Sequence, residues 1–240
     1  MKYLSILCLA SLLFAAGCSR RPAGNAPLMP GAKGTQIIEV SGGKQITSVG
    51  SDLPQPVVVQ VNGADGNGVA KALVLFRGEG AQFTPQQALT DSSGQVTVNV
   101  QLGAEPRGYQ IVAETMKPDG GMAIVTLREV ALGYQQKLGR EVNDKYCIRC
   151  HDSESTPERV SNFDNLSPAP HAFADGVFLN NLSDADLLAI TTRGGVAQAK
   201  SAAMPPFGGT LTDKQIKAVV AYMRAIADPP YTRPGVKYGK

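Results

Sequence analysis

Two cysteines and a histidine occur within five residues, in the order Cys147-Ile148-Arg149-Cys150-His151. Two thiols at this spacing can each add across one vinyl group of a porphyrin, and the adjacent imidazole then lies under the ring with a nitrogen free to ligate iron. Three side chains thus determine where the ring attaches, which face it turns to the protein and what binds the metal. The motif predicts covalent haem attachment through Cys147 and Cys150, with His151 as an axial ligand.

Two other interpretations of a Cys-x-x-Cys pair fit this sequence less well. A zinc site needs two more soft ligands at similar spacing, but the remaining cysteines, Cys8 and Cys18, lie in the N-terminal leader. A thioredoxin-like pair would lie at a strand-to-helix turn in a βαβ unit, whereas the residues before Cys147 are predicted to be helical. The histidine directly after the pair therefore favours haem.

A haem iron usually takes a second axial ligand, and Met204, in Met204-Pro205-Pro206-Phe207, is the first candidate. Its thioether would favour ferrous iron and raise the reduction potential, and the proline after it would stiffen the loop that presents the sulfur. A loop methionine that fills an apolar gap is the alternative for this residue. His171 is the rival distal ligand, because the chain has two histidines and bis-histidine ligation has no other residue to use.

The motif, the later Met-Pro-x-Phe segment and the helix that opens with Leu211-Thr212-Asp213 together resemble class I cytochrome c. In that family the two cysteines anchor one haem c, the histidine is the proximal iron ligand and the methionine is the distal ligand. The resemblance implies an all-α fold and assigns these roles, in that order, to Cys147, Cys150, His151 and Met204.

Three helices are predicted around this site. They are a segment from about Leu132 to Tyr146 that leads into the motif, a helix capped by Ser183 and ended by Arg193-Gly194-Gly195, and a helix capped by Thr212 that stops at Asp228-Pro229-Pro230. In class I cytochromes c the first and last helices cross, which suggests contacts among Gly139, Tyr146 and Tyr222. Within and beside the middle helix, the residues expected in the haem pocket or the core are Leu182, Leu187 and Ile190.

The N-terminal residues predict export from the cytoplasm. Lys2 precedes an apolar stretch that ends in Ala15-Ala16-Gly17-Cys18, small residues before a cysteine. This segment resembles a bacterial lipoprotein signal, which implies a signal peptide at 1–17 and lipid on Cys18. Such lipidation attaches a protein to a membrane without a spanning helix. An ordinary leader with a coincidental cysteine is the alternative, and a retained transmembrane anchor is disfavoured because the apolar run is short.

These assignments leave no thiol for a disulfide, since Cys8 belongs to the leader, Cys18 takes lipid and the other two cysteines take haem. Haem attachment of this type occurs outside the bacterial cytoplasm, so the leader and the haem motif support each other. The expected location is extracytoplasmic and membrane-anchored, on the periplasmic side, and Ser19 is compatible with the outer membrane. Residues 18–34, rich in Pro, Gly and Ala, are expected to form a flexible tether.

The pattern changes between about 35 and 131, where short runs rich in β-branched residues alternate with turns. The runs are 36–40, 56–61, 72–76, 95–100, 109–113 and 123–127. About seven short strands with a period of two predict an antiparallel β-sandwich. Residues 51–59, 65–70 and 90–96 carry a resemblance to bacterial immunoglobulin-like domains of the invasin and intimin type. Asp65, Asn67 and Asp91 are interpreted as turn residues that bond their own backbone rather than as calcium ligands.

The predicted fold class is therefore an all-β immunoglobulin-like sandwich followed by an all-α cytochrome c fold. The expected boundaries are 1–17 for the signal peptide, 18–34 for the tether, 35–131 for the sandwich, 132–228 for the cytochrome c domain and 229–240 for a C-terminal tail.

Charge does not identify a partner. The net charge of +3 includes Lys2, Arg20 and Arg21 of the N-terminal segments, and the chain has no basic run with interleaved aromatic residues, which excludes a typical nucleic-acid site. The expected partners are redox proteins and a membrane, with a larger respiratory complex as a further possibility.

Three functions follow from these features. The first is a membrane-tethered, monohaem electron carrier that is not itself an enzyme, with the sandwich as a spacer or docking module. The second is a haem subunit of a larger membrane oxidoreductase complex. The third is a haem peroxidase or ligand sensor, which needs an open iron site and a distal acid or base such as His171. Met204 as a ligand favours the first, because it keeps substrates away from the metal.

Overall fold

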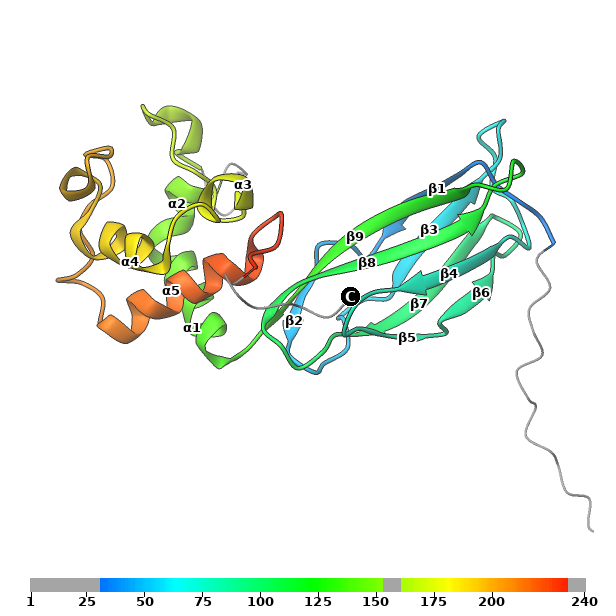
Figure 1. Ribbon diagram of the computed structural model, residues 1–240, viewed down its shortest axis with the longest axis horizontal. Coiled ribbons are helices and arrows are strands. Elements are labelled where there is room, and N and C mark those ends of the chain that lie inside the picture. Colours follow the sequence, from blue (N-terminus) through cyan, green and yellow to red (C-terminus); the bar gives the residue numbers. More distant parts are fainter. Residues whose placement is uncertain (1–30, 153–160, 233–240) are drawn as a thin grey trace, which may run out of the picture.

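The computed structural model describes residues 31–152 and 161–232, which form a two-sheet β domain followed by a helical domain (Figure 1). The predicted signal peptide, Cys18 and most of the predicted tether lie outside the described residues, as does the C-terminal tail from residue 233 onward. In the described part of the chain, no helix is both long and apolar enough to span a membrane.

The β domain contains a four-stranded and a five-stranded sheet. In the first, the strands lie in the order β1 (Gln36–Ser41), β3 (Val57–Asn62), β7 (Gln95–Gln101) and β5 (Gln82–Thr84). In the second, they lie in the order β2 (Ile46–Ser48), β9 (Met122–Leu132), β8 (Arg107–Met116), β4 (Leu73–Arg77) and β6 (Gln87–Leu89). Six of these strands coincide with the predicted runs, and the three-residue strands β2, β5 and β6 are additional.

One strand pair corrects the expectation of a purely antiparallel sandwich, because β2 pairs with β9 in parallel. The chain leaves β1 in one sheet and enters β2 in the other after four residues. Gly42, at φ +89°, and Lys44, at φ +60°, make this crossing, and the Lys44 amide then donates to the Arg128 carbonyl of β9. The sheet switch thus brings the chain alongside β9 in the same direction.

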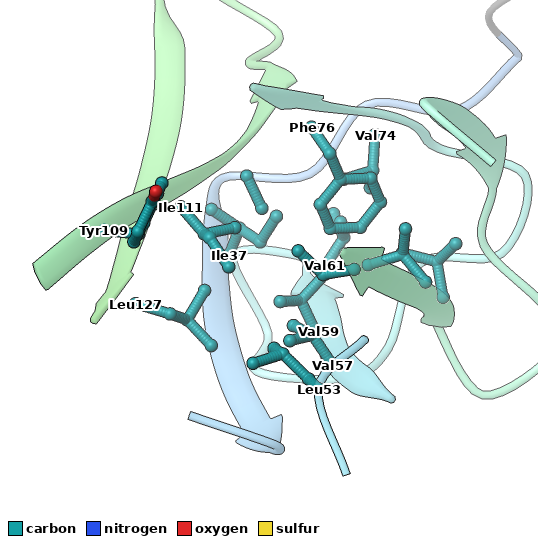
Figure 2. Close-up of a cluster of buried hydrophobic side chains, with 14 of the residues drawn as sticks. Ile37, Leu53, Val57, Val59, Val61, Val74, Phe76, Tyr109, Ile111 and Leu127 are labelled. Atoms are coloured by element: carbon teal, nitrogen blue, oxygen red, sulfur yellow. The ribbon is translucent and has the colours of Figure 1, made fainter. Parts of the chain in front are cut away.

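The core of the β domain is built from alternate residues of strands in both sheets. Val57, Val59 and Val61 of β3 are fully buried, while Val58 and Gln60 between them are partly exposed. The same period of two recurs along β7 and β8, so one face of each strand packs inward. Figure 2 shows the β3 valines facing Val74 and Phe76 of β4 across the domain.

The turns of the β domain are closed by aspartates that accept hydrogen bonds from their own backbone. Asp65 accepts from the Asn67 amide, and Asp91 accepts from the amides of Ser93 and Gln95. Hydrogen bonds from these turn residues lower the pKa of both aspartates. The geometry agrees with the interpretation of Asp65, Asn67 and Asp91 as turn residues.

The helical domain begins directly after β9. Its elements are α1 (Tyr134–Val142), the π-helical turn η1 (Asn143–Cys147), α2 (Ile148–His151), the 3-10 turn η2 (Phe163–Asn165), α3 (Gly176–Leu179), α4 (Asp184–Arg193), the 3-10 turn η3 (Val196–Gln198) and α5 (Asp213–Ile226). Both Ser183 and Thr212 form complete capping boxes, with Asp186 and Gln215 as their third-residue partners. Local sequence thus fixes the starts of α4 and α5.

Helices α1 and α5 cross at Gly139. A Cβ atom added to Gly139 would lie 2.0 Å from the Ala218 carbonyl oxygen and 2.7 Å from Tyr222 Cβ, so only glycine permits this approach. Tyr146, which was also expected at the crossing, has its ring 6.3 Å from the Phe207 ring in an edge-on arrangement. The aromatic contact of Tyr146 is therefore to the loop before α5.

The two domains meet along α5. Leu132 of β9 packs with Tyr222 and Ala225 of α5 in a small buried cluster. The Arg128 guanidinium of β9 pairs with the Asp228 carboxylate just after α5. In Figure 1 the helical domain lies at one end of the sandwich, and β9 leads straight into α1.

Candidate haem site

The Cys-x-x-Cys-His motif lies where the first helix changes its winding. Cys147 is the last residue of the π-helical turn η1, and Cys150 and His151 lie on α2. The two cysteines are free, Cys147 buried and Cys150 half-buried. Burial and the neighbouring Cys150 raise the pKa of the Cys147 thiol to about 12. A redox-active dithiol depends on a lowered thiol pKa, so this environment does not suit a thioredoxin-like pair.

His151 is held by a hydrogen bond to a backbone carbonyl. Its Nδ1 lies 2.7 Å from the carbonyl oxygen of His171. A carbonyl can only accept, so Nδ1 carries the proton and Nε2 keeps its lone pair. Burial is the largest cause that lowers the pKa of His151, which favours the neutral imidazole. The ring is therefore in the tautomer that ligates a metal through Nε2.

His171, the rival candidate for the distal ligand, lies beside His151, and its ligand role stays a prediction. The carbonyl oxygen of His171 accepts a hydrogen bond from the ring of His151. The ring of His171 stacks on the ring of Phe178, with centroids 3.5 Å apart. Its Nδ1 lies 2.9 Å from Asp175 Oδ2. The same Asp175 caps α3 by accepting from the Phe178 amide. His171 thus belongs to a local cluster with Asp175 and Phe178.

Met204 lies in the loop between η3 and α5, as the sequence order requires. Its carbonyl accepts from the Gly195 amide at 2.9 Å, and the Phe207 amide donates to the Thr191 carbonyl of α4 at 3.1 Å. Gly194, at φ +77°, packs so tightly on the loop that an added Cβ would lie 2.9 Å from the Met204 carbonyl oxygen. The loop is thus tied to Gly195, just after α4, at Met204 and to α4 itself at Phe207. The ligand role of Met204 stays a prediction.

An apolar cluster surrounds the motif. Cys147 belongs to it, together with buried residues of α1, α3, α4 and α5. Leu187 is buried in this cluster and Leu182 packs against it, whereas Ile190 is partly buried. Aromatic and aliphatic side chains at its partly exposed margin are Tyr146, Phe178, Leu182, Leu188, Phe207 and Ile226. Two free thiols, a neutral imidazole and an apolar surround form a donor set that fits a covalently attached haem.

One functional contribution had no signal in the sequence. The carbonyl that orients His151 comes from the backbone of His171, and backbone groups are the same at every residue. Asp175, whose carboxylate holds the His171 ring, was also not singled out. The four-residue spacing of His171 and Asp175 is a weak sign of such a pair, because residues this far apart meet only when the segment is helical or turned.

One protein-family model matches the helical region. Residues 135–223 match the family model described as "Cytochrome C oxidase, cbb3-type, subunit III". The match contains all four predicted haem residues and confirms the resemblance of this region to cytochrome c. No curated protein matches the chain.

Several solved structures resemble part of the chain. The D0-D1 domain of intimin shares 14% identity at a TM-score of 0.31, covering 40% of this chain and 47% of its own. The bacterial integrin-binding protein invasin shares 18% at a TM-score of 0.30, covering 40% and 19%. The adhesin InvE of Yersinia pseudotuberculosis shares 13% at a TM-score of 0.29, covering 39% and 31%. The chain thus spans less than half the length of each of these proteins.

Proposed function

We propose that the chain, whose residues 135–223 form a cytochrome c domain, is a membrane-tethered, extracytoplasmic carrier of single electrons with one haem c. The observation that carries the proposal is the 2.7 Å contact between His151 Nδ1 and the His171 carbonyl. This contact directs Nε2 of a neutral imidazole away from the backbone, as an iron ligand requires. Electron transfer needs such a rigid ligand more than it needs acid–base groups.

Each site residue has one task in this proposal. Cys147 and Cys150 would hold a haem through thioethers, and His151 and Met204 would supply a nitrogen and a sulfur to its iron. A bound haem contributes the reversible one-electron change between ferric and ferrous iron. Histidine and methionine together stabilise the ferrous form and raise the potential. If His151 and Met204 both bound the iron, no position would be left for a substrate, which suits a protein that transfers only electrons.

The immunoglobulin-like sandwich acts as a spacer in this proposal. The first described residues and the β8–β9 hairpin lie at the end of the sandwich away from the helical domain (Figure 1). Strand β9 has 11 residues, which corresponds to about 35 Å at roughly 3.4 Å per residue. Lipid on Cys18 would therefore attach the chain at one end of the sandwich and hold the cytochrome domain about this far beyond it.

The near-infrared absorption of the oxidised holoprotein tests the ligand assignment. Methionine ligation gives a weak sulfur-to-iron charge-transfer band there, and we expect this band together with no carbon monoxide binding by the untreated reduced protein. Absence of the band, carbon monoxide binding or fast turnover of hydrogen peroxide would instead support a peroxidase or ligand sensor. Separately, if lipid on Cys18 is the main anchor, Cys18→Ala should shift most of the protein from the membrane to the soluble fraction.

A haem subunit of a larger oxidoreductase is the second candidate. The observation that favours it is the matching family model, whose description names a subunit of a cytochrome c oxidase. Native electrophoresis of mildly solubilised membranes, stained for covalent haem, separates the two proposals. We expect the haem band at the size of the single chain in detergent, whereas a much larger haem-containing band that persists in mild detergent would favour the subunit.

A further inference from the structure

The outer face of the five-stranded sheet carries an apolar row at the end remote from the haem domain. Met116 of β8 and Met122 of β9 are direct partners across the β8–β9 hairpin, and Leu73 of β4 pairs with Leu89 of β6. The β4–β8 register, with Val74 opposite Thr115, places these pairs in line. We define Leu89, Leu73, Met116 and Met122, with Ile124 beside them, as the distal apolar row.

This row is exposed although its composition suits a buried surface. Met116, Met122 and Ile124 expose 47%, 45% and 52% of their surface, and Leu73 and Leu89 are partly exposed. An antiparallel sheet with one solvated face normally places polar residues there. The outer face of the other sheet is mixed, with Gln60, Thr97 and Asn99 beside the partly exposed Ile38 and Val58. A contiguous group of exposed apolar side chains such as the distal apolar row is typical of an interaction surface.

The place where the chain enters the β domain indicates a binding partner for this surface. The described chain starts at Gly31, and Ala32 bridges to Ala72, the residue before Leu73. The proposed lipid site, Cys18, precedes Gly31 by 13 residues, which span at most about 45 Å when fully extended. The membrane end of the chain therefore enters the fold directly beside the row.

We propose that the distal apolar row rests in the surface of the lipid bilayer, so that the sandwich touches the membrane with this face and does not hang freely on its lipid. The proposal rests on the membrane attachment proposed above. Apolar side chains at the interface gain free energy by leaving water. Two contacts, lipid and row, then fix the orientation in which the cytochrome domain is presented.

Charge at this end predicts which lipids are needed. The cations Lys33, Lys71 and Lys117 are matched in number by the turn carboxylates Asp65, Asp91 and Asp119. Glu114, which lies opposite Ile124, is paired with Arg77 at 3.2 Å. Lys117 also pairs with Asp119 at 3.4 Å. The end thus has no net charge, so contact depends on apolar burial rather than on anionic headgroups. We expect binding to phosphatidylcholine vesicles as well as to phosphatidylglycerol vesicles, with little dependence on salt.

Tryptophan substitution tests the contact, because the chain contains no natural tryptophan. The test uses the haem-loaded full chain with Cys18→Ala, which removes the lipid, and adds either Met122→Trp or Thr97→Trp. Thr97 lies exposed on the outer face of the other sheet. On addition of vesicles, we expect a blue shift of emission for Met122→Trp and none for Thr97→Trp. No shift at either position, or equal shifts at both, would overturn the proposal.

Charge insertion gives an independent test. Ile124→Lys should weaken vesicle binding about tenfold, which corresponds to the apolar burial of one half-exposed side chain plus the cost of the charge. Thr126→Lys is the matched control, since Thr126 is exposed two residues further along the same face of β9. Equal binding by both variants would contradict the row as the contact, as would a concentration-dependent dimer that Ile124→Lys dissociates.

The result is separable from the proposed electron-transfer function. Haem spectra and reduction are measured on the same variants, whose substitutions lie in the sandwich and leave the haem motif intact. If a variant loses vesicle binding but keeps a normal haem spectrum, the result bears on the membrane contact of the row and not on electron transfer. If the unsubstituted protein has an abnormal haem spectrum, the proposed electron-transfer function is contradicted, while the vesicle-binding result still tests the membrane contact.

Discussion

The ring of His151 and the backbone carbonyl of His171 are joined by a 2.7 Å contact, so the two histidines of the chain meet through one side chain and one main-chain oxygen. The ring of His171 contacts the Asp175 carboxylate and stacks on Phe178. The carbonyl does not depend on the side chain of residue 171. Substitution at this position therefore distinguishes a ligand from a supporting residue.

We expect His171→Ala to retain the sulfur-to-iron charge-transfer band and to change the midpoint potential only modestly, because the carbonyl that holds His151 remains. Met204→Ala should abolish the band and lower the potential or open the iron site. Absorption spectra and redox titration of both holoproteins check this difference. The reverse pattern, with loss of ligation in His171→Ala and an unchanged spectrum in Met204→Ala, would make His171 the distal ligand.

Gly139→Ala should destabilise the cytochrome domain by about 3 kcal/mol or more. The new methyl group would lie 2.0 Å from the Ala218 carbonyl oxygen, so α1 and α5 have to separate. Thermal unfolding followed by haem absorbance measures the loss. Gly209→Ala is the control in the same domain, since nothing lies within 4 Å of its added Cβ. Equal stability of the two variants would show that the helices do not cross as closely as described.

Arg224 ties α5 to the α3–α4 region through backbone carbonyls. Its Nη1 donates to the Leu179 carbonyl at 2.7 Å and its Nη2 donates to the Leu182 carbonyl at 2.5 Å. Nε also donates to Asp184, whose side chain is 59% exposed. Arg224→Ala should cost about 2–4 kcal/mol, because two carbonyls lose a charged donor.

Asp184→Asn removes the ion pair of Arg224 and leaves its hydrogen bonds to the Leu179 and Leu182 carbonyls intact. This variant should cost less than about 1 kcal/mol, as exposed ion pairs do. Urea unfolding of both variants gives the comparison. A loss in Asp184→Asn as large as that in Arg224→Ala would mean that the ion pair, and not the pair of carbonyl bonds, carries the stabilisation.

Features set by neighbours in sequence could be predicted. Ser183 and Thr212 were expected as caps, and both form capping boxes with the residue three positions later. Along β3 and β7, buried valines alternate with exposed or partly exposed residues, because successive side chains of a strand point to opposite faces. Such rules involve only a few consecutive residues, so the chain shows them directly.

Features set by distant partners could not be predicted. Strands β2, β5 and β6 have three residues each and exist because β9, β7 and β4 lie beside them. The role of the His171 carbonyl depends on a contact 20 residues back. The cysteines and histidine of the haem motif were recognisable because their side-chain chemistry is rare, whereas a backbone carbonyl has no such mark.

Glu129 is a further residue whose environment the sequence did not show. It lies on β9 with no exposed surface. The backbone N–H of Gln45 donates to Oε2 of Glu129 at 2.6 Å. Oε1 of Glu129 has no hydrogen-bond partner in the described part of the chain. Burial raises the pKa of this carboxyl to about 7, and the nearby Glu39 adds to the effect. The folded protein therefore keeps a proton on Glu129 that the unfolded chain releases at lower pH.

This raised pKa makes the folded β domain less stable as the pH rises. Between the ordinary glutamate value of 4.5 and about 7, the folded state binds more protons than the unfolded state, so the free energy of unfolding falls. The full loss is about 3 kcal/mol, spread from about pH 4.5 to above pH 7. Glu129→Gln keeps the acceptor for Gln45 without the ionisation, so the variant should lose this slope and exceed the parent in stability at pH 8.

Urea unfolding followed by far-ultraviolet circular dichroism at pH 5 and pH 8 measures the slope. Glu79→Gln is the control, because Glu79 belongs to the same domain and its side chain is 53% exposed. That variant should keep the pH dependence of the parent, because it leaves Glu129 unchanged. If Glu129→Gln retains the parental slope, the buried carboxyl is already ionised in the fold, and a cation or water must then reach Oε1.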